Sequence, residues 1–495
     1  MLNRRIVLAG IVVGAVAVLA LATVVSAQGI GQGSTSIQIQ NLSTDTEATV
    51  VIVYYNQDGT EQHSDGLTIP PGGSANRDTR ADYTDAQIPS NWRGSVVIYS
   101  DQPVVAISNQ YGGIWQAPYG SSGSYSEGAS TVTLPLIMCN WYGWNTNFHV
   151  QNTGSSATTV GVEYVPALAG VSYSNSVDVE PSASQSVDQS AMCGTIGSMV
   201  GGQIRFAGSV ILTSAEPIVA VVNEENSGQV MKYTYDGFVG AGDKVHAPLV
   251  LSRHYNNYTS LQIQNTSASA TANVTITYRA DDVYTLPDGL KGSTLVVTGT
   301  VAPKTTWVRY ERDATAKCLA ADPTASDDLC DYQRFVGAAQ ILSDQPVVVV
   351  TNLQNDVSGR AASYSGISAD DASQHAVAPL VMYSNYGWLT SLHIMNVGDN
   401  PTQVTIVYTP DSALSIPATG VVTKTHTIQP GELLLRYEQP GHPQSDLDGS
   451  FTRFVGSAKI SSDTENIALI VDEDKPGTGG DWLMSYNGFY EAPSP

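Results

Sequence analysis

The 495-residue chain has little positive charge and few charged residues of either sign. It contains 22 Lys or Arg against 45 Asp or Glu, which gives a net charge of −23. A surface of this sign repels nucleic acid and anionic membranes, so neither is expected as a partner. Charged residues make up 14 % of the chain, while Gly, Ser, Thr, Asn and Val are plentiful. That composition is typical of exported β proteins.

Cysteine is also scarce, with four in the whole chain. Cys139 and Cys193 fall in one segment, and Cys318 and Cys330 fall in another. This distribution predicts two disulfides within domains and therefore an oxidising compartment. A zinc site would need CxxC spacing and a neighbouring histidine, and the sequence offers neither, so no metal site is assigned.

Catalytic signatures are missing as well. There is no GxSxG elbow, HExxH helix or phosphate-binding loop, so we expect no enzyme and no cofactor. His149 and His393 occupy the position that Gln38 and Gln262 hold elsewhere, which indicates a polar structural position and not a base. His246 is expected to face solvent near a domain joint. Acidic loops are interpreted as solvated, with calcium (Ca2+) at the joints as the alternative.

An apolar segment opens the chain. Arg4 and Arg5 precede an apolar run from Ile6 to Val25, and the sequence VSA ends at Ala27. This order is typical of an export signal cleaved after Ala27. The run is long enough to remain as a membrane anchor instead. Residues 1–27 are therefore predicted to be a signal helix or an anchor, and the protein is predicted to be extracellular or at the cell surface.

The remaining chain contains one pattern four times. The stretch GSVVIYSDQPVVAISNQ begins at Gly94, and related stretches begin at Gly208, Gly337 and Gly456. A second motif places an asparagine at the end of an alternating strand in each copy: Asn41, Asn152, Asn265 and Asn396. A fixed period indicates tandem units, and alternation with period two indicates strands buried on one face. Asparagine at a strand end fits a turn with an Asx hydrogen bond.

Turn motifs divide each copy into about seven strands. SDQP and the mid-repeat sequences PPGGSA, EPSASQ, APKTTW and QPGELL are predicted to close antiparallel hairpins. A final strand carries a Tyr two residues before a Gly: Tyr235, Tyr364 and Tyr486. The predicted fold is all-β, with four tandem Ig-like antiparallel β-sandwich domains arranged as beads on short linkers. The predicted boundaries are 30–126, 131–240, 245–368 and 376–495.

Three copies begin with a strand that contains Ala-Pro-Leu or Leu-Pro-Leu, starting at Leu134, Ala247 and Ala378. The first copy has no clear counterpart of this strand. The C-terminal sequence YEAPSP resembles its start, so strand addition to another copy of the chain is an alternative mode of assembly.

The motifs YGWNTNFHVQNTGSSATTVGVEY and GSVVIYSDQPVVAISNQ resemble tandem repeats of exported bacterial surface proteins with Ig-like sandwiches. The resemblance covers nearly all of the chain after the signal. It implies a non-enzymatic extracellular or cell-surface protein, and it supplies no catalytic residues.

Aromatic residues gather in the loop between the first two strands of three copies. The set comprises Trp141, Tyr142, Trp144, Tyr255, Tyr258, Tyr386 and Trp388. Its absence from the first copy, which has no preceding domain, favours packing between domains; sugar contact and core burial are the alternatives. The leading functional hypothesis is a spacer or surface-layer component, and the alternative is a carbohydrate-binding or adhesive protein that uses these loops. Expected partners are cell-surface proteins, copies of the chain or glycans, with membrane contact only through an uncleaved N-terminal segment.

Overall fold

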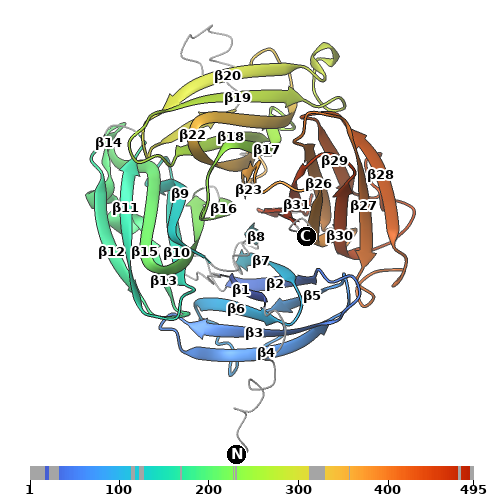
Figure 1. The fold of residues 1–495 in the computed structure, drawn as a ribbon, viewed down its shortest axis with the longest axis horizontal. Coiled ribbons are helices and arrows are strands. Elements are labelled where there is room, and N and C mark those ends of the chain that lie inside the picture. Colours follow the sequence, from blue (N-terminus) through green and yellow to red (C-terminus); the bar gives the residue numbers. More distant parts are fainter. Residues whose placement is uncertain are drawn as a thin grey trace, which may run out of the picture.

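The computed structural model describes residues 17–21, 33–112, 118–121, 128–167, 170–226, 228, 231–311, 329–355, 357–477 and 481–490. Most of these residues lie in antiparallel strands, which confirms the all-β prediction. Each of the four repeats contributes an outer and an inner sheet, and the repeats stand around a common axis as a ring (Figure 1). The precise domain boundaries remain a prediction from the sequence.

Repeat 1 shows the plan of one sandwich, in which four strands face four strands. The outer sheet has the order β1 (Ala17–Leu21), β6 (Gly94–Ser100), β3 (Ala48–Asn56) and β4 (Glu61–Ile69). The inner sheet has the order β5 (Ser74–Asp78), β2 (Gly33–Asn41), β7 (Val104–Gly112) and β8 (Pro118–Ser121). Apolar side chains of both sheets, such as Ile52 and Ile39, are fully buried between them.

Repeats 2 and 3 keep this order, but in each of them the sixth and seventh strands form one long strand that belongs to both sheets. The strands of repeat 2 are β9 (Ala129–Cys139), β10 (Trp144–Asn152), β11 (Thr158–Pro166), β12 (Tyr173–Val179), β13 (Ser184–Asp188), β14 (Ser198–Val200), the long β15 (Gln203–Asn226) and β16 (Met231–Asp236). Its two helical turns are η2 (Gln189–Met192) and α1 (Cys193–Ile196). Repeat 3 contains β17 (Gly242–Ser252), β18 (Tyr258–Asn265), β19 (Ala272–Ala280), η3 (Asp288–Leu290), β20 (Thr294–Val301), β21 (Thr306–Tyr310), the long β22 (Phe335–Asn355), β23 (Arg360–Ser365) and β24 (Ile367–Ser368).

Repeat 4 returns to two separate sheets. Its outer sheet contains β25 (His375–Tyr383), β27 (Thr402–Pro410), β28 (Val422–Ile428), β30 (Phe454–Ser462) and β33 (Phe489–Tyr490). Its inner sheet contains β26 (Leu389–Asn396), β29 (Leu433–Glu438), β31 (Ile467–Asp474) and β32 (Leu483–Asn487).

The strand connectivity differs from the Ig-like expectation. In an immunoglobulin domain the first, second, fifth and fourth strands share one sheet. Here the first, sixth, third and fourth strands share the outer sheet of repeat 1. The repeats are therefore two-sheet antiparallel sandwiches with their own topology. Periodicity in sequence identifies the strands but carries no information about which strands become neighbours.

The predicted arrangement as beads on linkers is wrong, because the repeats pack against one another around the axis. Ile107 of repeat 1 belongs to the buried core of repeat 4, and Val350 of repeat 3 belongs to that of repeat 2. The innermost strands β8, β16, β23 and β32 contact one another at the centre. There the Asp481 carboxyl accepts backbone N–H groups from Lys232 at 2.9 Å and Ala361 at 2.8 Å, which ties three repeats together.

The turn motifs link sheets, which corrects the prediction that they close hairpins. The PPGGSA turn leads from β4 in the outer sheet to β5 in the inner sheet, and SDQP leads from β6 to β7.

The tip of the mid-repeat turn contacts the preceding repeat. Ser95 donates a hydrogen bond to the Ser182 carbonyl at 2.7 Å, and Ser209 donates one to the Lys304 carbonyl at 2.6 Å.

The recurring asparagines act as predicted. In repeat 2, the side-chain amide of Asn152 donates to the carbonyls of Ser156 and Val179, and its Oδ1 accepts the N–H of Gly154. The same three-way pattern occurs at the other three asparagines: Asn41, Asn265 and Asn396. In every repeat an Asx turn therefore closes the connection that follows the second strand of the sandwich.

The Tyr-x-Gly motif fastens the innermost strand of a repeat to its first strand. The Tyr235 hydroxyl donates to the Leu136 carbonyl at 2.7 Å and also accepts the N–H of that residue at 3.1 Å. Tyr364 does the same with Leu249, and Tyr486 with Leu380. All three rings are buried, so the motif is structural.

The N-terminal segment is described only over Ala17–Leu21, where it forms strand β1 and not a helix. Leu21 pairs with Val96 of β6, as Leu134 of β9 pairs with Val210 in repeat 2. The segment thus supplies the first strand that the sequence of repeat 1 otherwise lacks. The predicted cleavage site at Ala27 and the C-terminal YEAPSP tail beyond Tyr490 lie outside the described residues. No helix in the described ranges is long and apolar enough to span a membrane.

Cys139 and Cys193 form the expected disulfide, with their Cα atoms 5.6 Å apart. It ties the end of β9 to the α1 turn. Cys330 is also disulfide-bonded, and Cys318 lies outside the described residues. A structural disulfide is typical of proteins folded in an oxidising compartment.

Candidate functional site

Three equivalent turns carry tyrosines into solvent at one end of the ring. Each is a two-residue hairpin between the first two strands of a repeat. In repeat 2, Trp141 and Trp144 exchange both backbone hydrogen bonds around Tyr142-Gly143. Both turn residues have positive φ, as a type I′ turn requires. The exposed fractions are 64 % for Tyr142, 71 % for Tyr255 and 77 % for Tyr386.

An arginine packs on each exposed ring. The guanidinium of Arg205 lies 4.0 Å from the ring centre of Tyr142, that of Arg334 5.6 Å from Tyr255, and that of Arg453 5.2 Å from Tyr386. Arg453 also donates a 3.0 Å hydrogen bond to the Tyr386 hydroxyl. Cation–π contact of this kind holds the rings in place at a partly exposed site.

The other predicted aromatic residues are largely buried. Trp144 is stacked on Tyr233, with ring centres 4.7 Å apart, and Tyr258 is buried against Tyr310. Trp388 is half-buried and meets Trp482 edge-on at 5.6 Å. Trp141 packs partly against the apolar cluster around Met138. The predicted set is therefore divided between exposed turn tips and the walls between repeats.

A cavity of about 320 Å³ lies between repeats 2 and 3. We call it the Trp144 cavity. Its aromatic walls are Trp141, Trp144 and Tyr233 from repeat 2, and Trp307 and Tyr310 from repeat 3. The polar lining includes Glu224 of β15 and three side chains of repeat 3: Gln262, Asn352 and Gln354.

The polar groups of the Trp144 cavity are partly paired across the interface. Asn352 donates to Glu224 Oε2 at 2.9 Å, and the Tyr233 hydroxyl donates to Gln354 Oε1 at 2.7 Å. Glu224 Oε1 and Gln262 Oε1 are buried and have no hydrogen-bond partner in the described part of the chain. Burial raises the pKa of Glu224 to about 8, so this carboxyl is mainly protonated at neutral pH.

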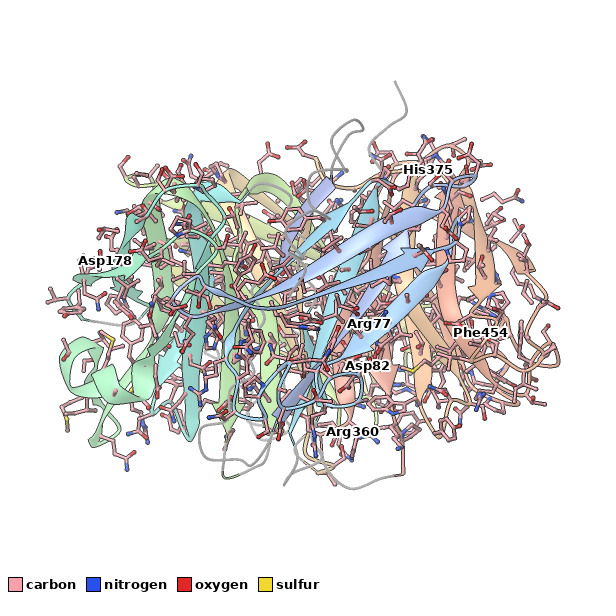
Figure 2. All side chains as sticks on the ribbon, turned by 90° about the horizontal axis from the view of Figure 1, so that it is seen from below. Arg77, Asp82, Asp178, Arg360, His375 and Phe454 are labelled. Carbon is pink, nitrogen blue, oxygen red and sulfur yellow. A yellow bond between two sulfur atoms is a disulfide. The ribbon has the colours of Figure 1, made fainter. Side chains whose placement is uncertain are left out.

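An equivalent cavity of about 340 Å³ lies one repeat further on, between repeats 3 and 4. We call it the Arg360 cavity. Figure 2 shows Arg360 at one end of the ring and His375 at the other. Tyr255 of the second tyrosine turn also lines this cavity, so the turn belongs to the Arg360 end. The aligned repeats place His393 where the Trp144 cavity has Gln262, and Leu353 where it has Glu224.

The Arg360 cavity brings together a serine, a histidine and an aspartate, but their geometry is not that of a catalytic relay. Ser391 Oγ and Asp472 Oδ2 both lie 3.1 Å from the same nitrogen, Nε2 of His393. A relay needs the two partners on opposite ring nitrogens. Asp474 pairs with Arg360 at 2.7 Å, and burial raises its pKa to about 6. The arrangement supports a packed ionic interface.

The histidines at the shared glutamine position lie in buried interfaces. His149 contacts Ser186 Oγ at 2.7 Å and Asn147 Oδ1 at 2.8 Å, and burial lowers its pKa to about 3. A neutral, fully paired imidazole of this kind is structural.

The prediction that His246 faces solvent is wrong, because β17 carries it into the interior with no exposed surface. No group of three or more potential metal ligands occurs in the described ranges.

Comparison with known proteins identifies no relative. No protein-family model and no curated protein matches the chain. One solved structure, described as a tetra-tandem repeat in the extending region of a large adhesion protein, aligns over 97 % of this chain and 100 % of its own, with 12 % identity. Its TM-score of 0.10 is too low to carry an argument about fold or function.

The polar half of the Trp144 cavity was not predicted from the sequence. Glu224 and Gln262 come from different repeats and meet only because the ring closes their interface. A position-by-position comparison of the four copies offers one signal: Gln110, Glu224, Leu353 and Glu473 are equivalent residues of the inner sheet. A glutamate at a buried strand position is rare enough to merit attention.

Proposed function

We propose that this chain is a non-enzymatic adhesive protein of the cell surface, which binds a macromolecular partner through the Arg360 end of its ring. The observation that carries the proposal is the repeated exposure of Tyr142, Tyr255 and Tyr386, each backed by an arginine. Tyrosine and arginine are enriched among the residues that dominate binding energy at protein interfaces. Three copies on one rigid frame would add multivalency.

Several features support this role over the alternatives. A chain that closes into a ring gains no reach from additional repeats, so a spacer is less favoured. The disulfide between Cys139 and Cys193 supports an extracellular location. The unsuitable geometry around His393 supports a non-enzymatic role. A surface-layer component, in which the partner is another copy of the chain, is the second candidate, because the same turns would face that copy.

The test compares two triple variants of the full exported chain. One carries Tyr142→Ala, Tyr255→Ala and Tyr386→Ala. The matched control truncates exposed residues on an outer strand and at the opposite end of the ring: Val239→Ala, Val296→Ala and Leu342→Ala. Binding to intact cells of the producing organism is measured by flow cytometry, and self-association by sedimentation velocity.

We expect the control to bind like wild type and the tyrosine variant to lose at least tenfold in affinity, with both retaining the melting temperature. Loss of cell binding supports adhesion, and loss of self-association supports the surface-layer role. Equal behaviour of both variants in the two assays would refute a docking face at the tyrosine turns.

A further inference from the structure

The Trp144 cavity has the features of a small-molecule site in its own right. Its volume of about 320 Å³ lies at the lower end of the range for ligand pockets. It lies at an interface between two repeats, where such pockets commonly occur. The role proposed above for the tyrosine turns does not involve it.

Two buried oxygen atoms in this cavity need a partner. Glu224 has no exposed surface and Gln262 is 1 % exposed, yet Glu224 Oε1 and Gln262 Oε1 make no hydrogen bond in the described part of the chain. A buried polar atom left unpaired destabilises the protein, because it has lost its hydrogen bonds to water without replacement. The two atoms come from opposite walls of the cavity, so one polar ligand between the repeats can satisfy both.

The charge of the cavity favours a neutral ligand. Glu224 is the one carboxylic acid among the described lining residues, and no Lys, Arg or His lines the cavity beside it. Asn352 already donates to Glu224 Oε2. With its pKa raised to about 8, the protonated carboxyl can donate a hydrogen bond to a ligand oxygen at neutral pH, while Gln262 Oε1 can accept a hydrogen bond from a ligand hydroxyl.

The walls favour a ligand with flat apolar faces. Trp141, Trp144 and Trp307 line the cavity, and Tyr233 braces Trp144 by stacking. Aromatic rings next to amide and carboxyl groups suit a molecule that has C–H faces and hydroxyl edges. From this geometry we propose that the Trp144 cavity binds a neutral saccharide of one or two rings. Its hydroxyl groups bond to Glu224 and Gln262, and its C–H faces contact the indoles.

The Arg360 cavity provides an internal control. The same strands build it, but Leu353 replaces Glu224, His393 replaces Gln262, and the tryptophan position at Trp144 is Asn257. Both interfaces close, so packing of the ring does not require tryptophans or a buried glutamate. The glutamate–asparagine pair recurs between repeats 4 and 1 as Glu473 and Asn109. Of the two cavities, the Trp144 cavity is the one that combines a buried glutamate with tryptophan walls.

The experiment titrates the full exported chain with neutral saccharides by isothermal calorimetry. The panel comprises glucose, galactose, N-acetylglucosamine, maltose, cellobiose, lactose and N,N′-diacetylchitobiose, with glucuronic acid as the charged probe. The test variant is Gln262→Leu, which removes the unpaired amide oxygen, together with the amide nitrogen that donates to Ser260 Oγ at 2.7 Å, and nearly keeps the volume. The matched control is His393→Gln, which places in the Arg360 cavity the residue that repeats 1 and 3 carry at this position as Gln38 and Gln262.

We expect at least one neutral sugar to bind with a Kd below about 1 mM and glucuronic acid to bind at least tenfold more weakly. Gln262→Leu should weaken binding at least tenfold with an unchanged melting temperature, and His393→Gln should leave binding unchanged. If no panel sugar binds below 10 mM, or if Gln262→Leu binds like wild type, the proposal is wrong. The tyrosine triple variant should still bind the sugar, so this outcome is independent of the adhesion test.

Discussion

The hydroxyl of Ser457 donates a 3.1 Å hydrogen bond to the carbonyl of Gly72, a residue 385 positions earlier in the chain. Ser95 and Ser209 make the equivalent bond from repeat 1 to repeat 2 and from repeat 2 to repeat 3. The bond from repeat 4 back to repeat 1 therefore closes the ring with the same contact that builds it. In repeat 3 the equivalent residue is Ala338, which has no hydroxyl to donate.

Ser457→Ala should destabilise the ring at its closure. The serine is buried, so the variant leaves the Gly72 carbonyl without this donor, at a cost of about 1 kcal/mol. Equilibrium denaturation in urea measures the change in the free energy of unfolding. Ser34→Ala removes another buried serine hydroxyl, within repeat 1, and is the control for a general loss of stability. Only the Ser457 variant should also increase proteolysis between repeats 4 and 1. Equal proteolysis patterns would contradict the closing role.

Ala338→Ser should supply the missing fourth bond. Gly431 occupies the position of Gly72 in the turn of repeat 4, and its carbonyl is the expected acceptor. We expect the free energy of unfolding to rise by about 1 kcal/mol, measured by urea denaturation. Ala339→Ser, at the buried neighbouring position, is the control and should destabilise the protein. A loss of stability in Ala338→Ser similar to that of the control would show that this joint is built differently.

Gly208→Ala should be strongly destabilising. A Cβ atom at this position would lie 2.2 Å from the Val165 carbonyl oxygen and 2.9 Å from the Phe206 ring. Overpacking against backbone costs about 3 kcal/mol. Gly240→Ala, where no atom lies within 4 Å of the added carbon, is the control and should be close to neutral. Thermal melting of both variants tests the prediction, and equal melting temperatures would refute it.

Trp144→Ala and Tyr142→Ala should differ in their effect on stability although two positions separate them. Trp144 is buried and stacked on Tyr233, so its truncation should cost about 3–5 kcal/mol. Tyr142 is exposed, and its truncation should change stability by less than about 0.5 kcal/mol. Chemical denaturation measures both values. A neutral Trp144→Ala would mean that this tryptophan does not support the interface.

Stability should fall as the pH rises from neutral to mildly alkaline values. Burial raises the pKa of Glu224 and of Glu473 to about 8, from an ordinary value of 4.5. The folded state therefore holds protons that the unfolded state has already lost. The resulting stability is complete below pH 4.5 and is lost as the pH rises through 8. The pKa of His149 is lowered to about 3, so this histidine reduces stability as the pH falls below about 6.5. It has no effect on the pH dependence above that value.

The pH window from 6.5 to 8 consequently excludes the titration of His149. The buried Asp236 and Asp481, whose pKa values burial also raises, act in the same direction as the two glutamates, so the glutamate contribution is the difference between wild type and variant. Over this window we expect a loss of roughly 2 kcal/mol for each glutamate. The double variant Glu224→Gln and Glu473→Gln should lose much less stability over the same range. Urea denaturation at several pH values measures the slope. A slope that is the same in wild type and variant would show that neither carboxyl stays protonated.

Local sequence patterns predicted the local structure well. The alternating strands and the Asx turns at residues such as Asn152 follow from neighbours in the chain, where side-chain periodicity and backbone sterics act directly. The same patterns could not assign strand partners. SDQP and PPGGSA were predicted to close hairpins, whereas both carry the chain from one sheet to the other. A turn sequence specifies a reversal of direction, while the packing of two sheets decides where the next strand pairs.

The sequence by itself determined that this protein is a fourfold repeat of antiparallel sandwiches with an acidic surface. Repetition, period-two alternation and composition are properties of the chain alone. Only the tertiary structure decided that the repeats close into a ring, because closure depends on contacts such as Ser457 with Gly72, whose partners are far apart in sequence. It also decided which aromatic residues face solvent and which line a cavity. Glu224 and Gln262 become neighbours in one cavity only when repeats 2 and 3 pack together, since each belongs to the inner sheet of a different repeat.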